Sequence, residues 1–306
     1  MVKNISDGVY PTMLTPFTGD NKIDYNGVLQ LLEFYSNAGC EGVFAICQSS
    51  EIFFLSFEER LELLKFIMKN LPKGMNIVAS GHTADCLDRQ IYEAKAFIDT
   101  GIDAYVFIAN RFAHEDESDG VFLNNYEKAV NSIPETGFGI YECPYPYKRV
   151  MKPETLKKCC EISNLMFIKD TCCHIEEIRA KLKATEGTGL KIFNANGATL
   201  FESLLAGCSG YSGVMANFHP EFYVWLCKNY KSQPEKAKAI ADFLSFASVT
   251  ELQQYPVNAK YHLKLMGMDI DTLCRSRDNS CFTESNEKEI KAMLNTERYL
   301  KKVFNI

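Results

Sequence analysis

The sequence lacks the features that would place the protein in a membrane or on a nucleic acid. None of its apolar runs approaches the ~20 residues that a membrane-spanning helix needs. The N-terminal segment MVKNISDGVYPTML has no apolar core of the kind found in secretory signals. The net charge of −6 at pH 7 excludes a general attraction to nucleic acid phosphates. We therefore expect a cytoplasmic protein that binds neither membranes nor nucleic acids.

Motifs for metals, nucleotides and serine nucleophiles are also missing. The chain contains no C-x-x-C pair, no Walker loop, no G-x-G-x-x-G and no nucleophile elbow. Its twelve cysteines include two adjacent pairs, Cys159-Cys160 and Cys172-Cys173, a spacing that suits a shared tetrahedral site badly. A chain of 306 residues needs no disulfide framework, so we interpret the cysteines as reduced, small core residues. The sequence thus predicts neither a metal ion nor an organic cofactor.

Short apolar runs recur about every 30 residues along the chain. Each is followed by a polar or Gly-containing turn and then by apolar residues at helical spacing, as at Leu87, Ile91, Ala94 and Ile98. There are eight such runs: Val9–Leu14, Gly42–Cys47, Asn76–Ser80, Ala104–Ala109, Gly139–Cys143, Met166–Lys169, Lys191–Asn194 and Tyr211–Ala216. Strict alternation of strands and helices is typical of a parallel sheet, and eight units favour a closed barrel over an open sheet.

The chain after residue 233 contains helical patterns without strands. Its clearest helices are predicted over Ala237–Leu252 and Glu287–Phe304, and no Pro/Gly/Ser-rich linker separates them from the barrel. We therefore predict an α/β fold, a (β/α)8 TIM barrel over residues 1–233. A C-terminal helical extension over residues 234–306 is expected to pack on it.

Two residues at predicted strand ends stand out, because the catalytic groups of such barrels lie at the C-terminal ends of the strands. Lys169 ends the apolar run LMFIK, and a partly desolvated lysine has a lowered pKa and a lone pair free to attack a carbonyl. Tyr141 lies near the end of the preceding run, where its phenol could pass protons to and from such a site. On spacing alone, a solvated lysine that opens a loop and an aromatic residue on the rim remain open alternatives.

Other constellations carry weaker hypotheses. Cys47 and Cys143 end two runs and His82 ends a third, which would suit a thiol enzyme, although buried small residues beside a loop histidine explain the same pattern. His82 and His219 are too few ligands for a metal-dependent aldolase. The acidic segment at residues 114–119 is typical of a solvated loop.

The order of several motifs resembles the dihydrodipicolinate synthase / N-acetylneuraminate lyase family of class I, pyruvate-dependent enzymes. CQSSE followed by LSFEER stands where the family has G-[ST]-T-G-E followed by L-S-x-E-E-R. YECP is similar to its Y-N-x-P, and FIKD to its G-[IL]-K-[ED]. GVYPTMLTPF with NKID is similar to its opening strand and turn, and LLAGCSGYSGVMAN to its last repeat. The similarity covers roughly residues 5–265 and implies a TIM barrel that forms a dimer or a tetramer.

The resemblance also implies roles for individual residues. Lys169 is expected to form a Schiff base with a 2-oxo acid, and Tyr141 to carry the protons. Gln48 and Ser49 stand where the second family motif holds the pyruvate carboxylate. A glutamine amide and a serine hydroxyl both donate hydrogen bonds, so that role is retained here.

Asn196, Gly213 and Arg111 are the remaining substrate-binding candidates. Asn196 follows the seventh run, and Gly213 lies in the segment that is similar to the last family repeat. Arg111 lies in Ala-Asn-Arg-Phe, where many members of the family have Pro-Tyr-Tyr, so a charge stands near the position of their tyrosine. Both glycines of the second motif are replaced as well, by Cys47 and Ser50.

Further departures favour a substrate other than those of the two best-known family reactions. Pro146 stands where the synthases have an arginine, and Gly197 and Ala198 stand where the sialic-acid lyases have an acidic pair. We expect a polar and mostly neutral mouth, formed by Asn194, Asn196, Ser212, Asn217 and Glu142, with Arg111 as the candidate partner of a terminal carboxylate. The function expected is that of an aldolase or dehydratase acting on pyruvate and a small 2-oxo or 2-keto-3-deoxy sugar acid. The alternatives are a synthase-type or sialic-acid-lyase-type activity, or a non-catalytic barrel that binds a 2-oxo acid.

Overall fold

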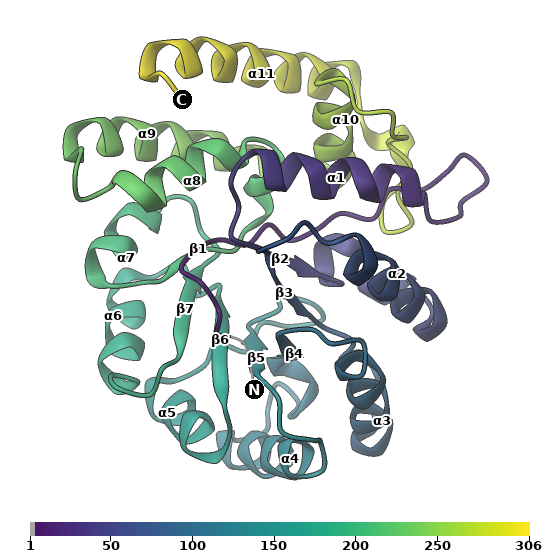
Figure 1. Ribbon diagram of the computed structural model, residues 1–306, viewed down its shortest axis with the longest axis vertical. Coiled ribbons are helices and arrows are strands. Elements are labelled where there is room, and N and C mark those ends of the chain that lie inside the picture. The colour runs from purple at the N-terminus through teal and green to yellow at the C-terminus, as the bar shows by residue number, and fades with distance from the viewer. Residues whose placement is uncertain (1–3) are drawn as a thin grey trace.

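The computed structural model describes residues 4–306, in which eight parallel strands form a central ring with helices around it (Figure 1). The strands are β1 (Gly8–Val9), β2 (Gly42–Ala45), β3 (Asn76–Ala79), β4 (Ala104–Ile108), β5 (Phe138–Tyr141), β6 (Leu165–Asp170), β7 (Lys191–Asn194) and β8 (Gly210–Tyr211). Their order in the sheet is β1-β8-β7-β6-β5-β4-β3-β2. The ring closes where Phe44 N donates to Pro11 O at 2.9 Å and Met13 N donates to Phe44 O at 3.0 Å. The predicted (β/α)8 barrel is confirmed.

A helix follows each strand and covers the outside of the ring (Figure 1). These helices are α1 (Tyr25–Asn37), α2 (Phe57–Asn70), α3 (Leu87–Ile98), α4 (Asp119–Asn131), α5 (Pro153–Ile162), α6 (Ile175–Ala184), α7 (Leu200–Ala206) and α8 (Pro220–Asn229). The motif LSFEER begins α2, because the Ser56 hydroxyl accepts from the Glu59 backbone N–H and the Glu59 carboxylate accepts from the Ser56 N–H. None of the helices in residues 4–306 combines the length and the apolar character of a membrane span.

The first and last strands are shorter than the apolar runs that predicted them. β8 ends at Tyr211, and Val214–Asn217 forms a short 3-10 helix where a strand was expected. The side-chain amide of Asn217 donates to the Val214 carbonyl at 3.0 Å and to the Thr12 carbonyl at 2.9 Å. The Asn217 side chain thus satisfies two backbone carbonyls that, in a longer strand, would accept hydrogen bonds from the backbone of a neighbouring strand.

Aromatic side chains fill the barrel below its C-terminal end. The ring centres of Tyr10 and Phe193 lie 4.8 Å apart, those of Phe167 and Phe193 4.7 Å, and those of Phe44 and Phe167 6.0 Å. All four side chains are buried. The barrel is a packed core and not a channel, so the space for a ligand lies at the strand ends.

The cysteines only partly follow the prediction that they are small core residues. All twelve lie within the described residues and none is in a disulfide. Six are buried: Cys40, Cys47, Cys143, Cys159, Cys208 and Cys274. Three are exposed, Cys86, Cys173 and Cys281, and lie in loops or short turns that flank the regular helices and strands.

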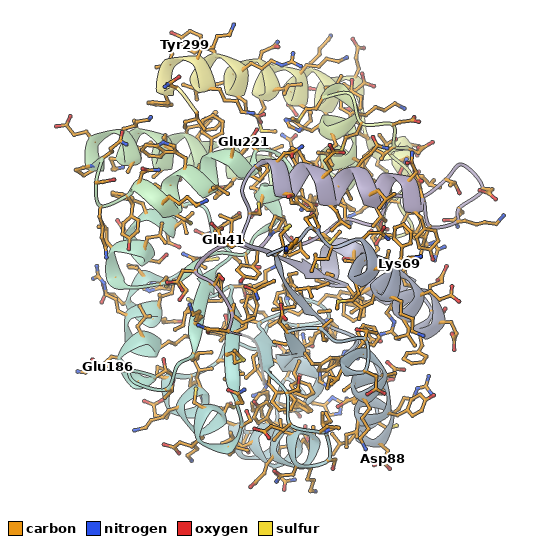
Figure 2. The ribbon with its side chains drawn as sticks, in the orientation of Figure 1. Glu41, Lys69, Asp88, Glu186, Glu221 and Tyr299 are labelled. Carbon is orange, nitrogen blue, oxygen red and sulfur yellow. The ribbon has the colours of Figure 1, made fainter. Side chains whose placement is uncertain are left out.

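The C-terminal helices lie outside the ring, beside α8 and α1 (Figure 1). They are α9 (Pro234–Ala247), α10 (Val257–Leu265) and α11 (Glu284–Phe304). The helix predicted over Ala237–Leu252 is α9 continued by the 3-10 helix η5 (Ser248–Leu252). The helix predicted from Glu287 begins earlier, at Glu284, because Thr283 and Asn286 form a capping box. Figure 2 shows Tyr299 on the outer side of α11, where it is 65% exposed.

A buried carboxylate ties α11 to the helices beneath it. Glu297 accepts from His219 Nδ1 at 2.9 Å and from His262 Nε2 at 3.0 Å. His219 precedes α8, and His262 lies on α10. Burial alone would raise the pKa of Glu297, but the charges and hydrogen bonds of the two histidines lower it to about 2. The extension is thereby held to the barrel by one buried, hydrogen-bonded cluster.

Replacing Glu297 by Gln is expected to lower the free energy of unfolding at pH 5 by about 3 kcal/mol, which is the energy of a pKa lowered from 4.5 to about 2. That stabilisation is present above pH 4.5 and is lost as the pH falls toward 2. Urea unfolding of parent and variant between pH 2 and pH 6 measures it. Glu289→Gln, on the exposed side of α11, is the matched control and should change stability by less than ~0.5 kcal/mol. A difference between parent and Glu297→Gln that does not shrink at low pH would contradict this account.

Candidate active site

Lys169 and Tyr141 lie side by side at the ends of β6 and β5, where they are partners in the register of the sheet. Each residue is 3% exposed, and Lys169 Nζ lies 4.4 Å from the centre of the Tyr141 ring. Within residues 4–306, no carboxylate or other hydrogen-bonding group contacts Nζ. Burial therefore lowers the pKa of Lys169 and raises that of Tyr141. A lowered pKa increases the share of neutral amine, which is the form that attacks a carbonyl.

A cavity of about 480 Å³ opens from this pair. Six of the seven residues predicted for catalysis or substrate binding line it: Gln48, Ser49, Tyr141, Lys169, Asn196 and Gly213. They lie at or just beyond the C-terminal ends of β2, β5, β6, β7 and β8. The rule that chemistry collects at these ends of the strands explains why residues so far apart in the chain meet here.

Gln48 and Ser49 both line the cavity, and the amide of Gln48 has a donor available to a ligand. The Tyr141 hydroxyl donates to Gln48 Oε1 at 3.1 Å, which orients the amide of Gln48. Its Nε2 has no acceptor in the described part of the chain, so it is free to donate. Ser49 Oγ donates to Thr12 Oγ1 at 3.0 Å. An amide and a hydroxyl side by side are suitable partners for a carboxylate.

Two side chains hold the loop after β2 although both of its motif glycines are replaced. Ser50 Oγ accepts from Cys47 N at 3.1 Å and donates to Met13 O at 2.6 Å. Glu51 accepts from Lys260 Nζ at 3.1 Å and from two backbone N–H groups of the C-terminal segment, those of residues 275 and 276, at 2.6 Å each. The loop that carries Gln48 and Ser49 is therefore fixed both to the N-terminal segment and to the C-terminal extension.

Arg111 is the one predicted site residue that does not line the cavity. Its guanidinium lies 5.3 Å from the ring centre of Phe53 and pairs with Asp85 at 3.0 Å. Phe53 itself lines the cavity, so Arg111 is one side chain removed from it. The thiol site considered from the sequence does not assemble either. Neither His82 nor Cys143 lines the cavity, and burial lowers the pKa of His82 to about 4 and raises that of Cys143 to about 11.

Glu142 was expected at the mouth and lies instead on the outer face of the strands. Successive residues of a strand point to opposite faces, so Glu142 and Asp170 point away from the cavity that Tyr141 and Lys169 face. Lys181 Nζ, from α6, contacts Glu142 Oε1 at 2.6 Å and Asp170 Oδ2 at 2.5 Å. All three side chains are fully buried. Burial alone would lower the pKa of Lys181, but the two carboxylates outweigh it and raise that pKa.

The other polar residues expected at the mouth lie mostly beneath it. Asn194 donates to two hydroxyls of the following turn and helix at 3.0 Å each, and Ser212 donates to Tyr10 O at 2.9 Å. Asn217 is buried as well. Of this group only Asn196 lines the cavity. Each buried member is hydrogen-bonded within the chain, as buried polar groups generally are.

Sequence reasoning missed a whole wall of the cavity. The C-terminal extension contributes Glu251, Leu252, Gln254, Tyr255, Pro256, Ser276 and Arg277, and the loops after β5 and β6 add Lys148 and Cys173. The Tyr255 hydroxyl accepts from Asn217 Nδ2 at 3.0 Å, which joins this wall to the turn after β8. The helical period that identified Ala237–Leu252 carries no information on which strand end the segment covers. The polar residues at the end of this segment were the one feature of the sequence that could have indicated a role at the cavity.

Comparison with known proteins gives one family. The family model of the dihydrodipicolinate synthetase family matches residues 5–296. The 4-hydroxy-tetrahydrodipicolinate synthase of Clostridium novyi is 23% identical over 280 residues, which are 91% of this chain and 92% of that protein. The enzyme of the same name from Brachyspira hyodysenteriae is 21% identical over 294 residues, or 95% of this chain and 98% of that protein.

Solved structures share the fold at low identity. YagE, a prophage protein of the dihydrodipicolinic acid synthase family from E. coli K12 solved in complex with pyruvate, has a TM-score of 0.86 and 20% identity over 95% of this chain and 98% of its own. CdNal from Clostridium difficile, solved in complex with mannosamine, has a TM-score of 0.84 and 16% identity over 95% and 99%. At these identities the likeness establishes the barrel and its C-terminal helices.

Replacing Lys181 by Met is expected to lower the free energy of unfolding by about 3–5 kcal/mol, because two buried carboxylates are left together without their cation. Lys183→Met, on the exposed side of the same helix, is the matched control and should have little effect. Adding Glu142→Gln to Lys181→Met should recover part of the loss. Urea unfolding of the four proteins checks this, and equal stability of Lys181→Met and Lys183→Met would contradict it.

Proposed function

This chain belongs to the dihydrodipicolinate synthetase family, and we propose that it is a lyase that binds a small 2-oxo acid as a Schiff base on Lys169. One observation carries the proposal. The amine of Lys169 is buried at the cavity, no carboxylate in the described part of the chain bonds it, and a phenol lies against it. Such an amine is neutral more often than an exposed one, and it reaches a bound carbonyl directly.

The chemistry needs only groups that line the cavity. Neutral Lys169 attacks the keto carbon to form a carbinolamine, and Tyr141 shuttles the protons as water leaves and the iminium forms. The iminium then accepts the electrons of the C3–C4 bond, or of a C3–H bond, to give the enamine. Gln48 Nε2 donates to the carboxylate, and the Ser49 hydroxyl turns from Thr12 Oγ1 to donate to it as well. The iminium is the electron sink, so the proposed reaction runs without metal or organic cofactor.

The remaining lining supports a short, hydroxylated substrate. Pro146 offers no cation where the synthases have an arginine, and Gly197 and Ala198 offer no side-chain acceptor for a long polyol. Lys148 and Arg277 line the exposed rim, where they are available to a terminal carboxylate in place of Arg111, which lies outside the cavity. We propose a 2-keto-3-deoxy sugar acid or a similar hydroxy-oxo acid as the substrate.

The chain is proposed to act as a cytoplasmic homo-oligomer, either a dimer or a tetramer. Apolar side chains at the end of α9 and on η5 support this assembly, because Phe246 is 80% exposed and Leu252 is 82% exposed. Val249, between them, is 57% exposed. A partner subunit would remove this apolar surface from water.

Reduction with borohydride in the presence of pyruvate is expected to add one reduced pyruvyl group to the protein, on the peptide that contains Lys169. Intact mass and peptide mapping measure it. Lys169→Ala should give no adduct, and Lys148→Ala, which removes the other lysine of the cavity, should give the full adduct. Labelling of another lysine, or an undiminished adduct in Lys169→Ala, would contradict the proposal. Absence of any adduct would favour the non-catalytic binder.

The substrate class is checked by release of pyruvate from a panel of 2-keto-3-deoxy and other 4-hydroxy-2-oxo acids. These rates are compared with cleavage of N-acetylneuraminate and with condensation of pyruvate and aspartate semialdehyde. A member of the panel is expected to have the highest kcat/KM, by a factor of ten or more, since each matched hydroxyl pairs a polar group of the site. The highest value for either of the last two reactions would show that the pocket is built for that alternative.

A further inference from the structure

Glu251 is a carboxylate of the cavity that the chemistry above does not use. It lies on η5, in the wall that the C-terminal extension adds, and its side chain is half-buried. No side chain or backbone group within residues 4–306 bonds its carboxylate. Among the residues that the structure describes, one other carboxylate lines the cavity, that of Glu51, which is occupied by Lys260 and two backbone N–H groups. Glu251 is therefore the carboxylate with oxygens available to a ligand.

The place of Glu251 in the ring complements that of Tyr141. In the sheet, β6, which ends at Lys169 and Asp170, has β5 on one side; on its other side lies β7, followed by β8. Tyr141 ends β5, whereas η5 contacts the turn Val214–Asn217 directly after β8. The amine of Lys169 thus has a phenol on one flank and a carboxylate over the other. The charges of Lys169 and Glu251 act on one another across this cavity.

The proposed substrate needs acid–base chemistry at a second position. Tyr141, which touches the amine, is placed for the protons of imine formation at C2. Cleavage or dehydration also moves a proton at the hydroxyl on C4, two carbons further along the substrate. Proton transfer requires hydrogen-bond reach, so a second acid–base group that lines the same cavity is a candidate for this position.

We infer that Glu251 is a second catalytic residue, the acid–base group for the C4 hydroxyl of a 4-hydroxy-2-oxo acid held on Lys169. This inference rests on the proposed function and extends it. In cleavage, the carboxylate takes the hydroxyl proton, the C3–C4 electrons move to the iminium, and an aldehyde leaves the enamine. In dehydration, the protonated acid gives its proton to the departing hydroxyl while the enamine electrons form the C3=C4 bond. Burial raises the pKa of Glu251, and the charge of Lys169 opposes that shift.

The test separates imine formation from the step at C4. The probe is the acid of the panel with the highest kcat/KM, and pyruvate serves for borohydride trapping. Glu251→Gln should lower kcat for pyruvate release by about a hundredfold or more, the usual scale for an acid–base group. It should leave the trapped adduct on Lys169 within about twofold of the parent. Tyr141→Phe should slow trapping as well as turnover. Glu202→Gln, an exposed carboxylate on α7, is the control for the same chemical change outside the cavity.

Chemical rescue gives a readout that a structural role would not move. Formate added to Glu251→Ala should restore part of kcat, because a small carboxylate can occupy the space left by the side chain. Unchanged turnover in Glu251→Gln would overturn the inference. So would a joint loss of turnover and trapping, since Glu251 would then act through Lys169. Failure of the parent itself to form an adduct would overturn the proposed function, and this inference with it.

Discussion

The site depends on one constraint: the Lys169 amine is removed from water, and no carboxylate among residues 4–306 bonds it. A carboxylate beside Lys169 would raise its pKa and keep it protonated. The next residue in the chain is a carboxylate, Asp170, yet strand alternation turns it to the opposite face. There Lys181 holds it together with Glu142. Two lysines twelve positions apart therefore have opposite electrostatics, because one faces aromatic rings and the other faces two acids.

The barrel alone does not complete this environment. Residues of the C-terminal extension form one wall of the cavity, and two buried clusters hold that wall in place. Glu51 joins the loop of the carboxylate-binding residues to Lys260, and Glu297 joins α11 to the layer below. A solvent path through this side would rehydrate the amine and return its pKa toward the ordinary value. The extension thus belongs to the electrostatics of the site as well as to the stability of the fold.

The parts of the site that could be predicted from the sequence are those fixed by the regular repeat of strands and helices. The ends of eight apolar runs located Lys169 and Tyr141, because strand ends of a parallel barrel converge whatever their separation in the chain. The prediction was wrong for residues whose position depends on which face of a strand they occupy or on a contact with a distant part of the chain. Glu142 lies one residue beyond Tyr141 and therefore faces outward, and Arg111 is drawn to Phe53 and Asp85. The end of the predicted helix at Leu252 agrees with the structure, but nothing in the helical period indicates that this end covers the mouth.

The central claim is most directly tested by the titration of the Lys169 amine itself. Lysine side chains labelled with isotopes can be followed by NMR as the pH is raised, and the resonance missing in Lys169→Arg identifies the residue. The account predicts that Lys169 titrates below the ordinary value of 10.5, while Lys181, identified by its loss in Lys181→Met, titrates above it. A Lys169 resonance that titrates at or above the ordinary lysine value would contradict the account, because the amine would then be charged and unable to attack a carbonyl near neutral pH.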